Sequence, residues 1–221
     1  MRVLVFSTPR SCSSYVIHIL SNVFDIKNYN ELFDQSVKPE ELPELVETKL
    51  YGTDDYAVKF MSGYFTMGWL DFDDIKWDMF DHIVFTERDD ITSHIASWYA
   101  IFSYNQDLNQ KLVRGEDVVE DIQDRFFDNE LISFKETFKN YNVYKNKLLK
   151  LYPEKCITLK YELFQKPIAE YLPVLNEITK FNFEEKHLYE KIRRKIDYRK
   201  VFSNYDKLEE IVTSWGNVHD N

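Results

Sequence analysis

The sequence predicts an α/β fold in which helices flank a central, mostly parallel sheet as a three-layer sandwich. Short apolar runs typical of buried strands recur along the 221 residues, and stretches of helical periodicity lie between them. Hydrophobic residues make up 44% of the chain, which is enough for a sizeable core. We therefore predict a single domain that spans residues 1–221.

Four segments are predicted as strands. The run 2–7 is continuously apolar from Val3 to Phe6, which is typical of a strand covered on both faces. The other candidates are 56–61, 82–88 and 156–161. Because helical stretches separate these strands, we expect parallel strands joined by right-handed crossovers.

Helical periodicity predicts the elements between the strands. Apolar residues in segment 13–24 follow the i, i+3, i+4, i+7 spacing of an amphipathic helix, and Ser11 or Ser13 is the predicted N-cap. The polar stretch 103–124 is interpreted either as a mobile excursion, such as a lid, or as a solvated loop with a short helix. The remaining predicted helices cover 39–50, 89–102 and 125–152, with another that follows Pro167 and restarts at Pro173.

Composition limits the classes of partner. The net charge of −10 disfavours non-specific binding to nucleic acid or to an anionic membrane surface. No apolar stretch approaches the ~18–20 residues of a membrane span, and the N-terminal residues lack a signal-peptide pattern. Cys12 and Cys156 are too few for a disulfide framework, and there is no CxxC pair. We expect a cytoplasmic protein without a metal site, a nucleic-acid partner or stable membrane insertion.

The segment 8–14, after the first predicted strand, has the composition of an anion-binding turn. Ligands of open α/β sheets bind at the carboxyl ends of strands, and a helix N-terminus there favours an anion. Arg10 can pair with a phosphate or sulfate through two hydrogen bonds, and the hydroxyls of Ser11, Ser13 and Ser14 can donate to it. A serine-capped turn with a solvated arginine explains this segment equally well.

Three familiar phosphate-binding motifs are absent from the sequence. There is no GxxxxGK[ST] loop of a P-loop NTPase and no GxGxxG dinucleotide fingerprint. His18, not arginine, stands six residues after Cys12, which disfavours a CX5R phosphatase. A separate thiol or redox role for Cys12 remains open, since a helix N-terminus lowers thiol pKa.

A second candidate anion site follows the predicted strand 82–88. Arg88 lies at the carboxyl end of this strand, and Ser97 follows nine residues later, about two turns into the next helix. Both side chains can therefore reach one phosphate. The alternative is an arginine paired with Asp89 or Asp90 and a serine that faces solvent.

These two segments together resemble the sulfotransferases that use 3′-phosphoadenosine-5′-phosphosulfate (PAPS). The loop of that family has the pattern T-x-P-[KR]-[ST]-G-[ST]-[ST], and "STPRSCSS" is similar to it, with Cys12 where glycine is usual. Its second motif is an arginine followed eight or nine residues later by a serine. The resemblance implies a P-loop-NTPase-like fold, and the bacterial trehalose-type sulfotransferases are the nearest branch. A Cβ at position 12 requires a negative φ or a slightly opened turn.

The resemblance also implies the PAPS contacts. Tyr161, in "ITLKYELF", resembles the tyrosine on the adenine side, and Tyr15 stands where some members stack an aromatic on adenine. Arg199 lies in a basic tail similar to one that closes over the 3′-phosphate, although which basic residue makes that contact stays open. Core tyrosines and a solvated basic face are the structural alternatives. The implied 5′-phosphosulfate contacts are Pro9, Arg10, Ser11, Cys12, Ser13 and Ser14, and the implied 3′-phosphate contacts are Arg88 and Ser97.

The implied reaction is in-line transfer of a sulfuryl group from PAPS to a hydroxyl or amine, with no metal required. Arg10 would stabilise the leaving phosphate. Glu31, in "NYNELFD", corresponds to the glutamate base of the trehalose-type branch, since Met61 replaces the histidine of the animal KTH motif. Lys59 would neutralise the transferring group or, as a strand residue, pair with an acid instead, and His94 is a weaker base candidate.

Other functions remain open on the sequence alone. A P-loop-type small-molecule kinase is one alternative. Another is a catalytically decayed nucleotide-binding relative, which Cys12 and Met61 favour. The acceptor is open among small molecules, glycans, lipids and peptides, and so is the oligomeric state.

Overall fold

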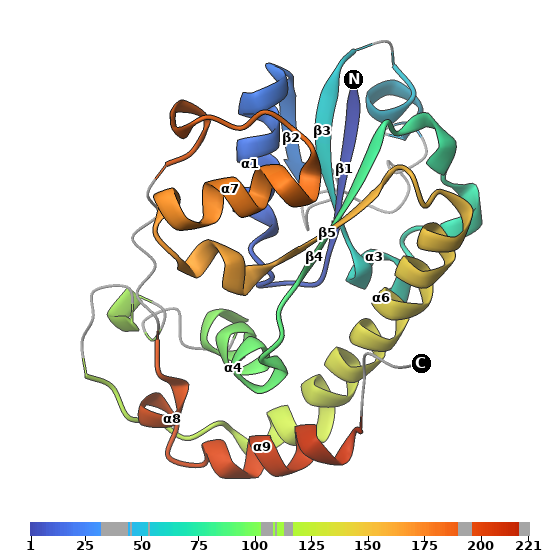
Figure 1. Cartoon of the computed structure of the whole chain (residues 1–221). Helices are drawn as coiled ribbons and strands as arrows, with labels where there is room; N and C mark the ends of the chain where they lie inside the picture. Colours follow the sequence, from blue (N-terminus) through green and yellow to red (C-terminus); the bar gives the residue numbers. More distant parts are fainter. Residues whose placement is uncertain are drawn as a thin grey trace.

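A five-stranded parallel sheet forms the centre of the molecule, in the order β2-β3-β1-β4-β5 (Figure 1). The computed structural model describes residues 1–31, 44, 46–52, 54–102, 108, 110–112, 117–189 and 196–216. The strands are β1 (Arg2–Ser7), β2 (Lys27–Glu31), β3 (Tyr56–Met61), β4 (His82–Glu87) and β5 (Cys156–Lys160). Every neighbouring pair is parallel, so the predicted α/β class is confirmed.

Helices connect the strands. The α-helices are α1 (Ser13–Phe24), α3 (Ser62–Thr66), α4 (Ile91–Phe102), α6 (Leu131–Leu151), α7 (Ile168–Thr179), α8 (Tyr198–Val201) and α9 (Tyr205–Ser214). The described residues also contain two π-helical turns, η2 (Val46–Leu50) and η5 (Phe126–Glu130), and the 3₁₀ turns η3 (Phe72–Asp74), η4 (Trp77–Met79), η6 (Tyr161–Gln165) and η7 (Glu185–His187). Across the described ranges, none of these helices has the length and apolar character of a membrane span.

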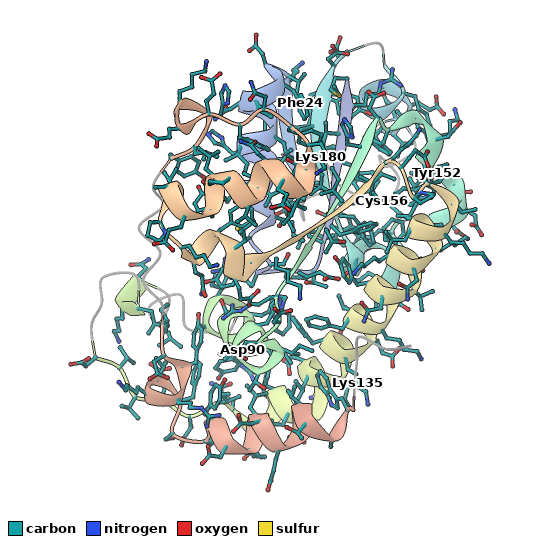
Figure 2. All side chains as sticks on the ribbon, in the orientation of Figure 1. Phe24, Asp90, Lys135, Tyr152, Cys156 and Lys180 are labelled. Carbon is teal, nitrogen blue, oxygen red and sulfur yellow. The ribbon has the colours of Figure 1, made fainter. Side chains whose placement is uncertain are left out.

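The sheet is covered on both faces, and side chains fill the space between the layers (Figure 2). Val3 and Val5 of β1 pack into a cluster with α1 and α7 on one face. Leu4 and Phe6 pack on the other face, against α3 and α6. All four of these side chains are fully buried, which explains the continuous apolar run in the sequence.

A third apolar cluster lies at the carboxyl ends of the strands, where α4, α8 and α9 meet (Figure 1). The segment before η5 joins it through buried Ile122 and through a backbone pairing between Glu120 and Phe202. This end of the predicted 103–124 excursion is therefore packed. Residues 103–107, 109 and 113–116 lie outside the described residues, so the lid interpretation stays a prediction.

Some predicted elements need correction. The strand β2 was not predicted, because its sequence KNYNE is polar and it pairs at the sheet edge through its backbone, with an irregularity between Asn28 and Asn30. The helix α7 continues through Pro173 instead of restarting there. Of the predicted helix 39–50, positions 46–50 form a π-helical turn, and most of the rest lies outside the described residues.

Strand order fixes where a ligand can bind. From β1 the chain moves outward to β2, whereas from β4 it moves to β5 on the opposite side. The connections thus diverge between the neighbouring strands β1 and β4, and such a switch point leaves a crevice at the strand carboxyl ends. The turn 8–12 and Arg88 lie at these two ends.

Candidate anion-binding site

The turn between β1 and α1 has an unusual backbone. Arg10 has φ 66° and Cys12 has φ 76°, both in the left-handed region. Cys12 is also the N-cap of α1, with no side-chain cap hydrogen bond, so the predicted serine N-cap is wrong. Its carbonyl accepts the first helical bonds, from Tyr15 N at 2.9 Å and Val16 N at 3.1 Å. The N–H groups that precede these belong to the first turn, where a helix provides no intrahelical partner.

The positive φ of Cys12 corrects the expectation that a Cβ here requires a negative φ. Only glycine adopts this conformation without a steric cost. We expect Cys12→Gly to be more stable than Cys12→Ala by about 1 kcal/mol, because both lose the sulfur but only alanine keeps a Cβ at positive φ. Urea unfolding of the two variants measures the difference. At exposed Asn22 inside α1 the same comparison should reverse, with alanine more stable by about 1 kcal/mol. Equal stability of the two Cys12 variants would contradict the left-handed conformation.

Ser11 braces the turn against the sheet. It is fully buried, and its hydroxyl donates to the Thr8 carbonyl at 2.8 Å. Its oxygen lies 2.7 Å from Thr86 Oγ1 on β4. The one hydrogen of Ser11 is used inside the turn, so its side chain holds the loop in this structure, and a contact of Ser11 with a ligand stays a prediction.

His94 fixes the turn from the other side. Its side chain is fully buried on α4, and its Nε2 contacts the Pro9 carbonyl. Burial lowers the pKa of His94 to about 3; the charges of Arg88 and Arg10 act in the same direction, and the bond to Pro9 opposes them. The ring is therefore neutral at physiological pH, with its proton on the nitrogen that faces the carbonyl. His94 has no access to an acceptor, so its candidacy as a base is wrong.

The neutrality of His94 should make folding sensitive to acid. Its folded pKa of about 3 lies below the usual 6.5, so the unfolded chain takes up the proton first as the pH falls. The stability that this group contributes is thus complete above pH 6.5 and is lost progressively between 6.5 and 3. We expect a loss of about 2 kcal/mol from pH 7.5 to pH 5 beyond that of His94→Gln, which keeps a donor but does not titrate. Urea unfolding at both pH values tests this, and equal pH dependence of the two proteins would refute it.

The structure brings Arg10, Arg88 and Ser97 together. Arg10 Nε donates to Ser97 Oγ at 3.3 Å. Arg88 is 8% exposed, and its guanidinium lies 4.5 Å from the centre of the Tyr161 ring. Its buried Nε has no hydrogen-bond acceptor in the described part of the chain. A buried donor without an acceptor is costly, which indicates a site built for an anion.

The structural alternative for Arg88 is not what the structure shows. Asp89 pairs instead with Lys160, with 2.8 Å between Oδ1 and Nζ. Asp90 accepts a hydrogen bond from the backbone N–H of Ser93 at 2.8 Å. Both neighbouring carboxylates are thus engaged elsewhere, and the guanidinium of Arg88 lies over the ring of Tyr161.

Glu31 and Lys59 also meet, on neighbouring strands. They are paired in register at the carboxyl ends of β2 and β3, and Oε1 and Nζ lie 2.5 Å apart. Lys59 is 2% exposed and donates to Ser14 Oγ at 3.0 Å, whereas Glu31 is 38% exposed and its Oε2 accepts from Tyr64 Oη at 3.5 Å. A carboxylate open to solvent is thereby connected to the first turn of α1.

Two of the predicted residues lie elsewhere. Tyr15 is 2% exposed, and its hydroxyl lies 2.5 Å from that of Tyr171 inside the core between the sheet and α7. Arg199 is exposed on α8 and forms ion pairs with Glu209 and Asp206 of α9. Neither side chain joins the arginine cluster, so their contacts with a nucleotide stay predictions.

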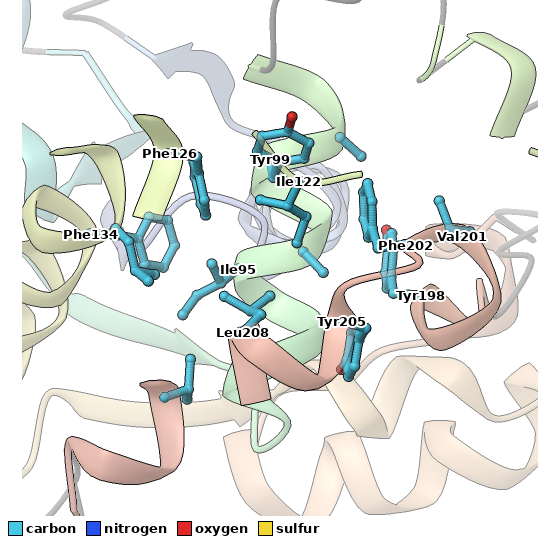
Figure 3. Packing of buried hydrophobic residues seen from close by; sticks show 14 of the residues in the cluster. Ile95, Tyr99, Ile122, Phe126, Phe134, Tyr198, Val201, Phe202, Tyr205 and Leu208 are labelled. Atoms are coloured by element: carbon cyan, nitrogen blue, oxygen red, sulfur yellow. The ribbon is translucent and has the colours of Figure 1, made fainter. Parts of the chain in front are cut away.

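One neighbour of the cluster was missed from the sequence. Tyr198 of α8 is buried (Figure 3); burial raises the pKa of its hydroxyl, and Ser97 and the charges of Arg88 and Arg10 act in the opposite direction. The signal for this residue in the sequence is its place in the basic tail, directly before Arg199. Within the described ranges, no three His, Cys, Asp or Glu side chains form a group that could hold a metal, and a metal-independent reaction stays a prediction.

Comparisons with known proteins give information on the fold of the chain. No protein-family model matches the sequence, and a comparison with curated proteins also finds no match. The chain is similar to the crystal structure of mouse sulfotransferase SULT7A1 complexed with PAP, with 10% identity, a TM-score of 0.50, and coverage of 99% of this chain and 85% of that one. A sulfotransferase domain from the curacin biosynthetic pathway gives 16% identity, a TM-score of 0.44, and coverage of 98% and 90%. At these identities the first likeness shows a sulfotransferase fold alone, and the second carries no weight.

Proposed function

We propose that the protein is a sulfotransferase that moves a sulfuryl group from PAPS to a hydroxyl or amine acceptor. The observation that carries this proposal is the cluster of Arg10, Arg88 and Ser97, with its buried unpartnered donor, at the switch point of the sheet. The likeness in fold to a sulfotransferase solved with PAP supports it.

The donor groups form two neighbouring anion positions. One is the N-terminal turn of α1, where backbone N–H groups and a helix dipole favour a 5′-phosphate. The other is Arg88 with Ser97, which suits a separate phosphate. Arg10 lies between them. A nucleotide with phosphates on two different positions of its ribose fits this arrangement, and PAPS is such a nucleotide.

The chain's own residues supply the remaining chemistry. PAPS, when bound, provides the activated sulfuryl group. Arg10 and the amides of the turn stabilise negative charge on the leaving phosphate. Glu31 accepts the proton of the acceptor hydroxyl, and its ion pair with Lys59 holds the carboxylate in place. Lys59 donates to both Glu31 and Ser14, so its positive charge lies between the base and the turn that holds the phosphate.

The alternatives have less support. A kinase loop surrounds contiguous phosphates with glycine amides and a lysine, and this turn has neither. A decayed relative would not be expected to keep a buried Lys59 paired with Glu31 beside the anion turn. Met61, whose sulfur accepts from Ser7 Oγ at 3.1 Å, leaves Glu31 as the base candidate on these strands.

Calorimetry tests the proposal directly. Adenosine 3′,5′-bisphosphate should bind at least about tenfold more tightly than adenosine 5′-monophosphate, since only the former reaches Arg88. Tighter binding of ATP–Mg²⁺ than of the bisphosphate would favour the kinase alternative. Radiolabelled sulfuryl transfer from PAPS to a panel of trehalose, simple alcohols, phenols and glycolipids would then identify the acceptor class.

A further inference from the structure

We infer that Tyr161 is a positioning residue, which holds the guanidinium of Arg88 by its ring face and leaves the N–H groups of that guanidinium for an anion. The identity of the anion as a nucleotide phosphate rests on the proposed function. This role of Tyr161 differs from the contact with adenine that the resemblance implies, and the two roles have different consequences for nucleotide binding.

Neighbouring parallel strands bring Arg88 and Tyr161 side by side. Glu87 ends β4 and Lys160 ends β5, and these two residues are paired in register. The next residues along the two strands are therefore Arg88 and Tyr161. The guanidinium lies over the tyrosine ring, with 4.5 Å between Cζ and the ring centre.

Two further contacts fix the chain at this junction. The carboxylate of Glu162 accepts a hydrogen bond from the backbone N–H of Asp89 at 3.1 Å, and this bond is strengthened by the charge of its acceptor. Asp89 also pairs with Lys160, although both side chains are exposed and the pair alone contributes little. Asp89 follows Arg88, and the other two residues flank Tyr161. The two strand ends are thus held together where the ring meets the guanidinium.

The charge of Arg88 stays available for a ligand. Glu87 pairs with Lys145, and Asp89 is engaged with the end of β5. Within the described ranges, Arg88 forms no ion pair, and its buried Nε has no acceptor. A ring face attracts a cation without using the in-plane N–H groups of a guanidinium. Tyr161 can therefore hold the side chain while its donors remain free for an anion.

The ratio of two nucleotide affinities separates the possible roles of Tyr161. Adenosine 3′,5′-bisphosphate and adenosine 5′-monophosphate both contain adenine, so loss of an adenine contact weakens both to the same extent. Loss of support for Arg88 weakens the bisphosphate selectively, because only its 3′-phosphate reaches that arginine.

Calorimetry with both nucleotides on Tyr161→Leu and Tyr161→Phe measures this ratio. Tyr161→Leu removes the ring and should weaken the bisphosphate about tenfold and the monophosphate less than about twofold. Tyr161→Phe keeps the ring and should keep the ratio within about twofold of the wild type. Tyr205→Leu is the matched control, since the ring of Tyr205 lies 5.0 Å from Cζ of another arginine, Arg199, and it should leave the ratio unchanged.

Fluorinated phenylalanines at position 161 provide a readout that keeps the shape of the ring. Fluorine withdraws charge from the ring face and so weakens its attraction for a cation. The ratio should fall stepwise from phenylalanine to difluorophenylalanine and trifluorophenylalanine, and in Arg88→Ala the same series should leave it unchanged. A constant ratio across the series, or an equal loss of both nucleotides, would overturn the inference.

Failure of the proposed function is recognisable separately. If the wild type does not prefer the bisphosphate, the nucleotide assignment falls, and thermal shift with inorganic phosphate decides the role of Tyr161. A phosphate-induced shift that is kept in Tyr161→Phe and reduced by trifluorophenylalanine at the same position supports the inference. An equal shift in both variants, or no shift in the wild type, overturns it.

Discussion

Replacing Arg88 with alanine should weaken the binding of adenosine 3′,5′-bisphosphate by about 100-fold or more. The lost guanidinium is buried, has no acceptor for its Nε among the described residues, and lies over the ring of Tyr161. A charge-assisted, two-pronged contact with a phosphate is worth about 3 kcal/mol in such a setting. Binding of adenosine 5′-monophosphate should change far less, because that nucleotide lacks the 3′-phosphate. Calorimetry with both nucleotides measures the effect.

Two arginine variants sharpen this experiment. Arg88→Lys keeps the charge but loses the planar fork, and we expect it to recover only part of the affinity. Arg199→Ala removes an exposed guanidinium that is already paired with Glu209, and it should change the affinity less than about twofold. An Arg199→Ala loss equal to that of Arg88→Ala would instead place the 3′-phosphate at the C-terminal tail.

Replacing Glu31 with glutamine should lower the rate of sulfuryl transfer by about 10²–10⁴-fold. Glutamine has nearly the same shape and can still accept hydrogen bonds from Lys59 and Tyr64, but it cannot take a proton from the acceptor. Affinity for adenosine 3′,5′-bisphosphate should stay within about twofold, because Glu31 contacts the turn only through Lys59. The initial rate with the best acceptor of the panel is the measurement.

Glu87→Gln is the matched control for this change. Glu87 ends β4 as Glu31 ends β2, and it also forms an ion pair, with Lys145, although its carboxylate is 12% exposed compared with 38% for Glu31. Loss of an ion pair alone would slow both variants to a similar extent. Transfer in Glu31→Gln within about tenfold of the wild type would remove Glu31 as the base.

Strands that are buried on both faces could be predicted from the sequence. β1, β3 and β4 are buried along most of their length, and their apolar runs indicate strands in the sequence. β1 and β3 have the predicted bounds, whereas β4 and the partly buried edge strand β5 end one residue earlier than predicted. The edge strand β2 gives no such signal. Its side chains alternate between solvent and partial burial, and its pairing with β3 relies on backbone hydrogen bonds.

The candidate site also has features that could be predicted from the sequence and features that could not. Arg10, Arg88 and Ser97 were predicted because strand ends and helix starts bring such residues to one edge of a parallel sheet, and the structure does bring them together. Their roles toward PAPS stay predictions. The left-handed backbone at Cys12 could not be predicted, because a residue with a Cβ argues against it.

The contacts of His94 and Tyr198 also could not be predicted from the sequence. Each depends on how segments far apart in the chain pack: His94 reaches a carbonyl of the N-terminal turn, and Tyr198 reaches α4 from the C-terminal helices. Neither residue type in its local sequence distinguishes such a contact from an ordinary buried side chain.

The packing of α8 and α9 on α4 is completed late in biosynthesis. All five strands and the turn at Arg10 leave the ribosome before α8 does, so a nascent chain can assemble its sheet early. Until α9 follows, Ile95 of α4 lacks the cover that Leu208 supplies in the same cluster. The emerging chain therefore carries an exposed apolar face on α4 until α9 has been made, and the packing of α9 removes this aggregation hazard.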